Sequence, residues 1–148
     1  MRYEITELTN MVLVIDKKNN KVLVEDRKNQ NWPGYTFPGG HIEEDESFTV
    51  AAQREVFEET GLHVHNLTLN GIKQFSMTIN VRFMCLLYST TEFSGSLKSS
   101  AEGKVFWMNL DDLLANNRLA DGLADVVKIM TSPELSEVQY SGKNPKFY

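Results

Sequence analysis

The chain has 148 residues, of which 41% are hydrophobic and 24% are charged, and its formal net charge is −5. This length suits one domain with a substantial core and leaves no room for a second, so we expect a single domain over residues 1–148. The ordinary composition excludes a largely disordered chain. The acidic balance argues against stable binding of nucleic acid, which requires clustered Lys and Arg side chains.

The N-terminal residues and the cysteine content bear on the cellular compartment of the protein. The N-terminal MRYEITELTN has no apolar stretch of the kind found in signal peptides, and no run approaches the ~20 apolar residues of a membrane span. The single cysteine, Cys85, cannot form an internal disulfide and lies in an apolar run, as small core residues do. We therefore expect a cytoplasmic protein with no membrane partner, either a monomer or a homodimer.

The first part of the chain is rich in β-prone residues. Thr9–Ile15 and Lys21–Val24 flank the polar stretch DKKNN, which predicts a hairpin. Arg27 ends the second of these runs, and the loop KNQNWPG follows it. Tyr35–Phe37 is a further short β-prone stretch that PGG terminates, and the glycines there allow a positive φ or a close approach of the backbone to a ligand.

A helix is predicted near residues 47–60. Ser47 is a suitable N-cap, and Gly61 can take the left-handed position that follows a helix. Val50 and Phe57 form a second apolar patch, which predicts that this helix is contacted on two sides.

Three glutamates of this helix are spaced to meet. Glu55, Glu58 and Glu59 are related by i, i+3 and i+4, so their carboxylates emerge on one face. On a helical wheel they fall within or beside the apolar sector that contains Phe48 and Val56, which predicts an inward orientation rather than a solvated face. Clustered carboxylates repel one another unless water or a cation separates them, and hard divalent cations favour such oxygens.

The second half of the chain predicts further strands and helices. We expect strands at 67–75, 81–88 and 104–108 and helices at 111–115 and 122–130. The polar stretch 89–103 is expected to be a loop, and the tail 131–148 is either loose or a late strand. This order of elements predicts an α/β fold with a mixed sheet flanked by helices.

The stretch that contains the glutamates resembles the Nudix box, G-x5-E-x7-R-E-U-x-E-E-x-G-U, in which U is aliphatic. The fixed positions are all filled, by Gly40, Glu46, Arg54, Glu55, Val56, Glu58, Glu59, Gly61 and Leu62. A match at so many fixed spacings is far more specific than a short motif. The resemblance implies a Nudix-type α/β/α sandwich around a mixed central sheet, which agrees with the predicted order of elements.

The resemblance also implies a chemistry. Nudix enzymes hydrolyse a nucleoside diphosphate linked to another group, and they do so with Mg²⁺, for which Mn²⁺ can substitute. The metal ligands implied by motif position are the Gly39 carbonyl, Glu55, Glu58 and Glu59. Glu46 and Arg54 would orient these ligands, and the general base would be Glu55 or a glutamate outside the box.

Residues outside the box are matched to the family one by one. Glu102 precedes a strand with a tryptophan, as a metal-binding glutamate of MutT-like proteins does, although the offset differs and a solvated loop residue is the alternative. Arg27 resembles an arginine that contacts substrate phosphate, with a surface salt bridge as the alternative. Phe37 is placed to contact a purine or to pack in the core, and Asn117 or Asp121 could hydrogen-bond to the edge of the base.

Two downstream markers bear on the substrate. Thr78 occupies the place where Nudix enzymes that act on ADP-ribose usually have a proline, and residues 77–80 lack the tyrosine of dinucleoside polyphosphate hydrolases. The resemblance therefore implies a MutT-like pyrophosphatase for (deoxy)nucleoside triphosphates, with oxidised purines such as 8-oxo-dGTP as candidates. Removal of pyrophosphate from the 5′ end of RNA, and nucleotide sensing without catalysis, stay as alternatives.

Overall fold

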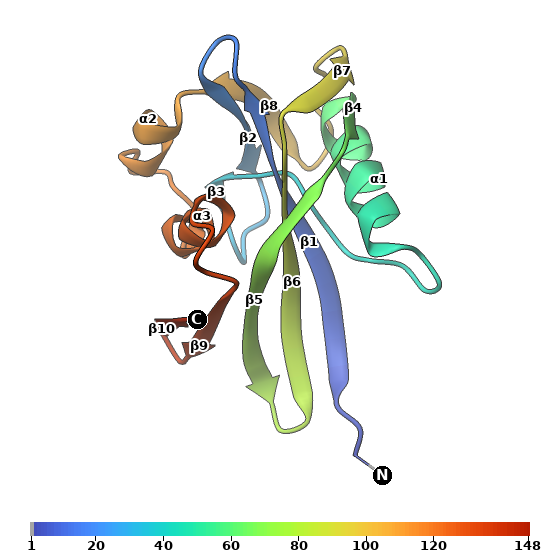
Figure 1. Ribbon diagram of the computed structural model, residues 1–148, viewed down its shortest axis with the longest axis vertical. Helices are drawn as coiled ribbons and strands as arrows, with labels where there is room; N and C mark the ends of the chain where they lie inside the picture. The colour runs from blue at the N-terminus through green and yellow to red at the C-terminus, as the bar shows by residue number, and fades with distance from the viewer. Residues whose placement is uncertain (1) are drawn as a thin grey trace.

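A twisted mixed sheet separates helix α1 on one face from helix α3 on the other (Figure 1). The computed structural model describes residues 2–148. The strands are β1 (Ile5–Asp16), β2 (Lys21–Arg27), β3 (Gly34–Thr36), β4 (Leu62–His65), β5 (Thr68–Thr78), β6 (Val81–Thr90), β7 (Glu92–Gly95), β8 (Gly103–Met108), β9 (Glu137–Ser141) and β10 (Asn144–Phe147). The helices are α1 (Phe48–Thr60), α2 (Leu110–Leu114) and α3 (Leu123–Thr131). The predicted α/β fold is thus confirmed.

The main sheet has the strand order β10-β9-β5-β6-β1-β2-β3, and β8 pairs with β2. Strands β1 and β6 are parallel, as are β5 and β9, whereas the other pairs are antiparallel. The predicted hairpin between β1 and β2 is present, and so is the pairing of β5 with β6. The central strand β1 therefore lies between β6 and β2, which are far apart in the sequence.

The apolar run in β1 supplies two cores because its side chains alternate between the faces of the sheet. Met11 and Leu13 pack on the face that α3 covers, whereas Val12 and Val14 pack on the face that α1 covers. A strand that is buried on both sides needs such a continuous apolar run. The two helices thereby hold the sheet, and the loop beside β1, in a fixed position.

Helix α1 has the predicted caps. Val50 N–H donates to Ser47 Oγ at 3.4 Å, and Gly61 has a φ of 76° and donates its N–H to the Phe57 carbonyl at 2.9 Å. The predicted contact on a second side of the helix is only partial, because Val50 and Phe57 are both about half exposed. The ring of Phe57 stacks on His63 of the adjoining strand β4, with 4.5 Å between the ring centres.

Two segments differ from the predicted loops. Strands β4 and β7 pair with each other in a small second sheet, although 89–103 is predicted as a loop. Each has four residues, too few for a clear alternation in the sequence, and Val64 and Phe93 pack them against the core under α1. The tail forms the hairpin of β9 and β10. No helix within residues 2–148 is long and apolar enough to span a membrane.

Candidate active site

The loop Pro38-Gly39-Gly40 lies antiparallel beside β1. Val12 N–H donates to the Pro38 carbonyl at 2.9 Å, and Asn10 N–H donates to the Gly40 carbonyl at 2.8 Å. A Cβ atom at Gly39 would collide with the backbone of Asn10, and one at Gly40 would collide with the carboxyl group of Glu55. Neither glycine has a positive φ. Glycine is therefore required at position 39 for close approach of two backbones, whereas a side chain at position 40 would displace the carboxyl group of Glu55.

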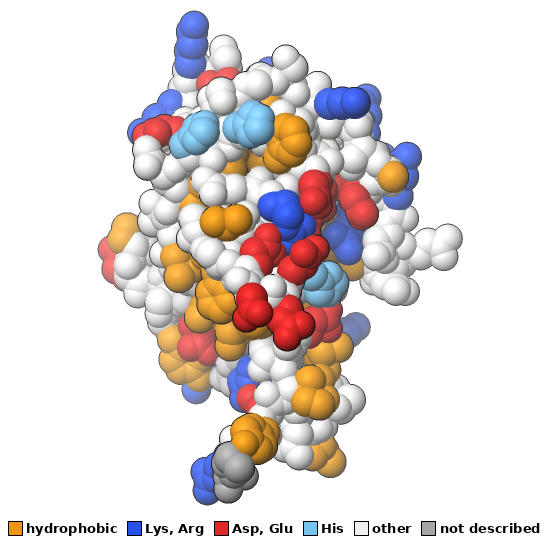
Figure 2. All heavy atoms as spheres, turned by 90° about the vertical axis from the view of Figure 1, so that its right-hand side faces the viewer, with side chains coloured by type: hydrophobic (Ala, Val, Ile, Leu, Met, Phe, Trp, Pro, Cys, Tyr) orange, Lys and Arg blue, Asp and Glu red, His pale blue; other side chains and the backbone are white. Residues whose placement is uncertain are grey.

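Arg54 connects the acidic residues at the surface of this site. Its guanidinium donates to both oxygens of Glu46 at 2.6 and 2.9 Å, to Glu55 Oε1 at 3.0 Å and to Glu58 Oε2 at 3.2 Å. It also donates to the His41 carbonyl at 3.0 Å. The bond to Arg54 lowers the pKa of Glu46 to about 2. Figure 2 shows acidic side chains gathered around a basic one on the face that carries α1.

A second pair of carboxyl groups lies deeper. Glu59 is 5% exposed and Glu25, from β2, is 2% exposed. Glu59 Oε2 accepts a hydrogen bond from Gly39 N–H at 3.1 Å, whereas Glu25 Oε1 has no partner among residues 2–148. Burial, followed by the neighbouring Glu25, raises the pKa of Glu59, and burial also raises the pKa of Glu25. Two buried carboxyl groups in contact either retain a proton or need a cation.

The three clustered glutamates do not share one environment. Glu59 is buried, the side chain of Glu55 is 14% exposed, and that of Glu58 is 56% exposed. The prediction of an inward orientation is therefore wrong for Glu58. The physical reason is that successive residues of a helix are 100° apart, so a buried Glu59 leaves Glu58 at the edge of the helix.

The donor set fits a hard divalent cation. All of the candidate ligands are oxygens, and the neighbouring Glu25 has a buried carboxyl oxygen with no partner among residues 2–148. Within residues 2–148, no three side chains of His, Cys, Asp or Glu are already gathered around a shared metal position. The residues that could hold the cation are Glu55, Glu58 and Glu59, with the backbone of Gly39 facing the same group.

Glu102 lies in the exposed loop before β8. Burial is the largest cause that raises the pKa values of Glu25 and Glu55, and the charge of Glu102 adds to both shifts, as expected of a carboxylate near the cluster. Sequence reasoning missed Glu25. Its signal was present in the strand KVLVEDR, where Glu25 shares a face with the core residue Leu23. An acid at an inward position of a buried strand needs a partner or a cation.

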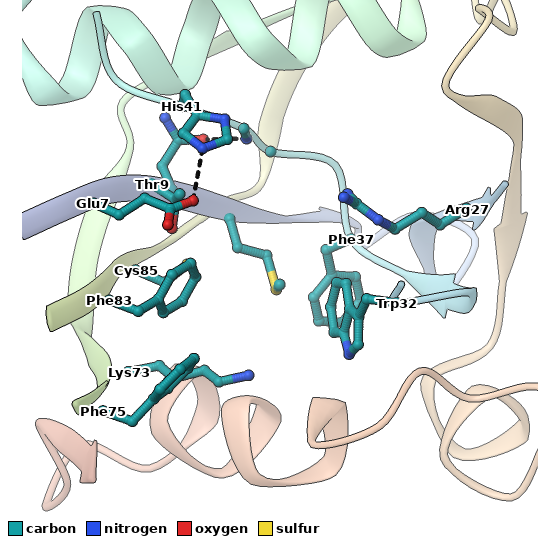
Figure 3. A pocket seen from close by; sticks show the side chains of 14 residues that line it. Glu7, Thr9, Arg27, Trp32, Phe37, His41, Lys73, Phe75, Phe83 and Cys85 are labelled. Carbon is teal, nitrogen blue, oxygen red and sulfur yellow. Dashed lines mark hydrogen bonds and ion pairs between the residues drawn. The ribbon is translucent and has the colours of Figure 1, made fainter. Parts of the chain in front are cut away.

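A cavity of about 370 Å³ opens on the other side of the glycine loop (Figure 3). Gly39 and Gly40 form one end of it, and the rings of Phe75 and Phe83, stacked at 4.8 Å, form part of its wall. Trp32 completes the aromatic lining on the opposite side. The walls are suited to a flat aromatic ring.

Two of the residues expected to bind substrate, Arg27 and Phe37, line the aromatic cavity. Arg27 lines the cavity with its guanidinium 5.5 Å from the centre of the Trp32 ring, and none of the ion pairs within residues 2–148 involves it. Phe37 is both a core residue and a cavity residue.

The loop between α2 and α3 carries the two other residues expected to contact a base. Asn117 lies on an exposed turn and lines neither the aromatic cavity nor the one beside Asp121 described next, so the structure does not bring it to the expected base site. Asp121 lines a second cavity of about 350 Å³, and its carbonyl accepts a hydrogen bond from Trp32 Nε1 at 2.9 Å. This backbone contact fixes the ring of Trp32.

Comparison with known proteins decides the family. The family model of the NUDIX domain matches residues 7–128. The chain belongs to the Nudix hydrolase family. Hydrolases of this family act on nucleotide substrates and generally use a divalent metal ion.

Relatives of this Nudix hydrolase agree in sequence and fold. It is 30% identical over 128 residues to the uncharacterized Nudix hydrolase YvcI of Bacillus subtilis, which covers 83% of this chain and 77% of that protein. It is 32% identical over 109 residues to an 8-oxo-dGTP diphosphatase of Buchnera aphidicola, covering 71% of this chain and 80% of that one. The structure of a MutT protein from Bacillus halodurans superposes with a TM-score of 0.75 at 25% identity and covers 96% of both chains.

Proposed function

We propose that this Nudix hydrolase is a Mg²⁺-dependent pyrophosphohydrolase that cleaves (deoxy)nucleoside triphosphates to the monophosphate and pyrophosphate. Mn²⁺ substitutes for Mg²⁺, and 8-oxo-dGTP is one candidate substrate. The observation that carries the proposal is the position of Gly39 and Gly40. They line the aromatic cavity on one side and contact Glu59 and Glu55 on the other. A base in the cavity thus leaves its phosphates beside the carboxylates.

Each residue of the site then has a role. Glu55, Glu58, Glu59 and the Gly39 carbonyl hold the metal ion, with Glu102 as a further ligand from outside the box. When bound, the ion neutralises phosphate charge and lowers the pKa of the attacking water. Arg27, at the cavity wall, binds substrate phosphate. The general base is Glu55 or Glu102.

Arg54 and Glu46 act by orienting the ligands. The guanidinium of Arg54 takes one oxygen of Glu55 and one of Glu58 and leaves the other oxygen of each free. Glu46 holds the guanidinium through two hydrogen bonds, a fork geometry that fixes the plane of the group. This arrangement limits the rotation of two ligands whose mutual repulsion would otherwise drive them apart.

The substrate class is supported by the relatives and by the sequence markers. One relative is named an 8-oxo-dGTP diphosphatase. Thr78 stands in the place of the proline expected in hydrolases of ADP-ribose. Both observations favour triphosphates over ADP-ribose.

A panel of nucleotides tests the proposal. The protein is incubated with dGTP, 8-oxo-dGTP, ADP-ribose and a 5′-triphosphorylated RNA, each with Mg²⁺, with Mn²⁺ or with a chelator, and the products are identified. We expect monophosphate and pyrophosphate from the free triphosphates in the presence of either metal ion. Hydrolysis of ADP-ribose alone would refute the substrate class. Steeply salt-dependent cleavage of the RNA would favour the RNA alternative, and calorimetric binding without any product would favour a nucleotide sensor.

A further inference from the structure

Lys73 points into the aromatic cavity from its floor (Figure 3). Strand β5 places it opposite Cys85 of β6, two residues along each strand from Phe75 and Phe83, so these four side chains share a face of the sheet. Lys73 Nζ lies 5.6 Å from the centre of the Trp32 ring. The cavity, which is otherwise lined largely by rings at this end, thus has a cation at its floor.

The ammonium group of Lys73 makes no hydrogen bond and no ion pair with any group in residues 2–148; its close contacts are the rings of Trp32 and, at 5.3 Å, Tyr140. Burial lowers the pKa of Lys73, and the negative charges of Asp121 and Asp125 oppose that shift. Lys73 is half-buried, and an ammonium group that faces a cavity without an acceptor gains a hydrogen bond when a ligand supplies one. The geometry therefore favours a ligand with an acceptor atom at its edge.

Several of the other polar groups nearby are already bonded. Trp32 Nε1 donates to the Asp121 carbonyl, and Thr9 Oγ1 donates to the Met84 carbonyl at 3.1 Å. Burial raises the pKa of the Cys85 thiol to about 11, so this group stays neutral at physiological pH. Two further donors of the cavity lining, Asn10 Nδ2 and Arg27 Nε, are buried without a partner in residues 2–148. Asn10 Oδ1 accepts a hydrogen bond from Gly40 N–H, so that side chain lies at the glycine loop, whereas Lys73 is the cation on the face of the sheet that carries Phe75 and Phe83.

We propose that Lys73 sets the base preference of the site by donating a hydrogen bond to the carbonyl oxygen of a keto base. Hypoxanthine, guanine and uracil present an oxygen at the relevant edge, whereas adenine and cytosine present an amino group whose hydrogens face the ammonium. This inference rests on the proposed function, because it places the base of a nucleoside triphosphate in the cavity. A site built to hydrogen-bond one edge group discriminates against an analogue that leaves the site's polar group unpaired.

Two pairs of substrates isolate this contact. ITP and ATP differ at the purine 6-position, and UTP and CTP differ at the pyrimidine 4-position. We expect the wild-type kcat/KM to favour ITP over ATP and UTP over CTP by about 10–100-fold, the range of one charge-assisted hydrogen bond. In Lys73→Met both ratios should fall close to one while ATP is still hydrolysed. In Lys73→Arg, which keeps the cation, the preference for the keto base should persist.

Lys128→Met is the matched control. Lys128 also carries its ammonium over an aromatic ring, 4.9 Å from the centre of Phe147, but it lines neither the aromatic cavity nor the cavity that contains Asp121. Loss of this charge should leave both substrate ratios unchanged. Circular dichroism and thermal unfolding of all three variants verify that they are folded.

The outcomes separate this inference from the proposed function. The role of Lys73 would be overturned if the wild type hydrolysed ITP and ATP, and UTP and CTP, with equal kcat/KM. It would also be overturned if Lys73→Met kept the wild-type ratios. In both cases the proposed function would stand. If no triphosphate is hydrolysed, the proposed function fails. The affinities of IMP and AMP, measured by calorimetry, then test the role of Lys73 in base preference. Tighter binding of IMP that is lost in Lys73→Met would support the role, whereas equal binding, or binding of neither, would refute it.

Discussion

Glu58 and Glu59 are neighbours in the sequence, yet the fold gives them different surroundings. Glu58 is largely exposed and contacts Arg54, whereas Glu59 is buried against Glu25 and the Gly39 N–H group. A change at Glu59 would alter both folding and chemistry, because it replaces a buried carboxyl group that contacts Glu25 and Gly39 N–H. Glu58 is therefore the better residue for testing the metal site separately from stability.

Glu58→Gln should lower turnover by at least about 100-fold, because the amide is a much weaker ligand for a divalent ion. The free energy of unfolding should change by less than about 0.5 kcal/mol, as for most exposed positions. Steady-state kinetics with Mg²⁺ and urea unfolding measure the two quantities. The control is Glu44→Gln, which removes an exposed acid of the preceding loop and should leave turnover unchanged. Full activity of Glu58→Gln would show that Glu58 is not a metal ligand.

Helix α1 is the element that positions the site. Ala51 and Ala52 are buried, and their small side chains allow the helix to lie close to the sheet. Gly61 ends the helix in the left-handed conformation, and the chain then enters β4 directly. The end of the helix is also packed, since a Cβ atom at Gly61 would lie 2.6 Å from the Ser96 carbonyl oxygen. The C-terminal cap thus fixes the helix that carries Glu58 and Glu59.

Gly61→Ala and Gly142→Ala form a matched pair that tests this cap. Both glycines have a positive φ, 76° and 60°, but a Cβ atom at Gly142 would have no atom within 4 Å. We expect Gly142→Ala to cost about 1 kcal/mol of unfolding free energy through backbone strain alone. Gly61→Ala should cost at least about 2 kcal/mol, because a collision adds to the strain. Equal losses in urea unfolding would mean that a small shift of the Ser96 segment relieves the collision.

At the scale of the whole molecule, the tail belongs to the main sheet. Strand β9 pairs in parallel with β5, and Val138 is fully buried in the core under α3. Ser136 N–H also donates to the Tyr148 carbonyl at 2.8 Å, which ties the end of the chain to the start of β9. The tail thereby contributes Tyr140 to the surroundings of Lys73. We expect the sheet and the tail to unfold together, in keeping with the predicted single domain.

Val138→Ala tests this cooperativity. Loss of two buried methyl groups should lower the free energy of unfolding by about 1–3 kcal/mol. One transition should be observed, with the same midpoint by tryptophan fluorescence and by circular dichroism. The same substitution at the exposed Val50 should change the free energy by less than about 0.5 kcal/mol. An early transition confined to one probe would show that the tail unfolds separately.

The sequence by itself determined the features that depend on local signals. The β-prone runs of β1 and β2, the caps at Ser47 and Gly61 and the spacing of the box residues all act within a few residues, so the elements and the family could be predicted from them. Strands β4 and β7 were missed because four residues carry too little pattern.

Only the tertiary structure decided which box residues face inward and what lies opposite them. Helical spacing fixes the angles between side chains, but it does not specify which face of the helix packs on the sheet. In the structure that face buries Glu59 and leaves Glu58 exposed. The contact of Glu59 with Glu25, and the position of Lys73 beside Trp32, join segments far apart in the chain. Such contacts depend on strand order and register, which no local pattern specifies.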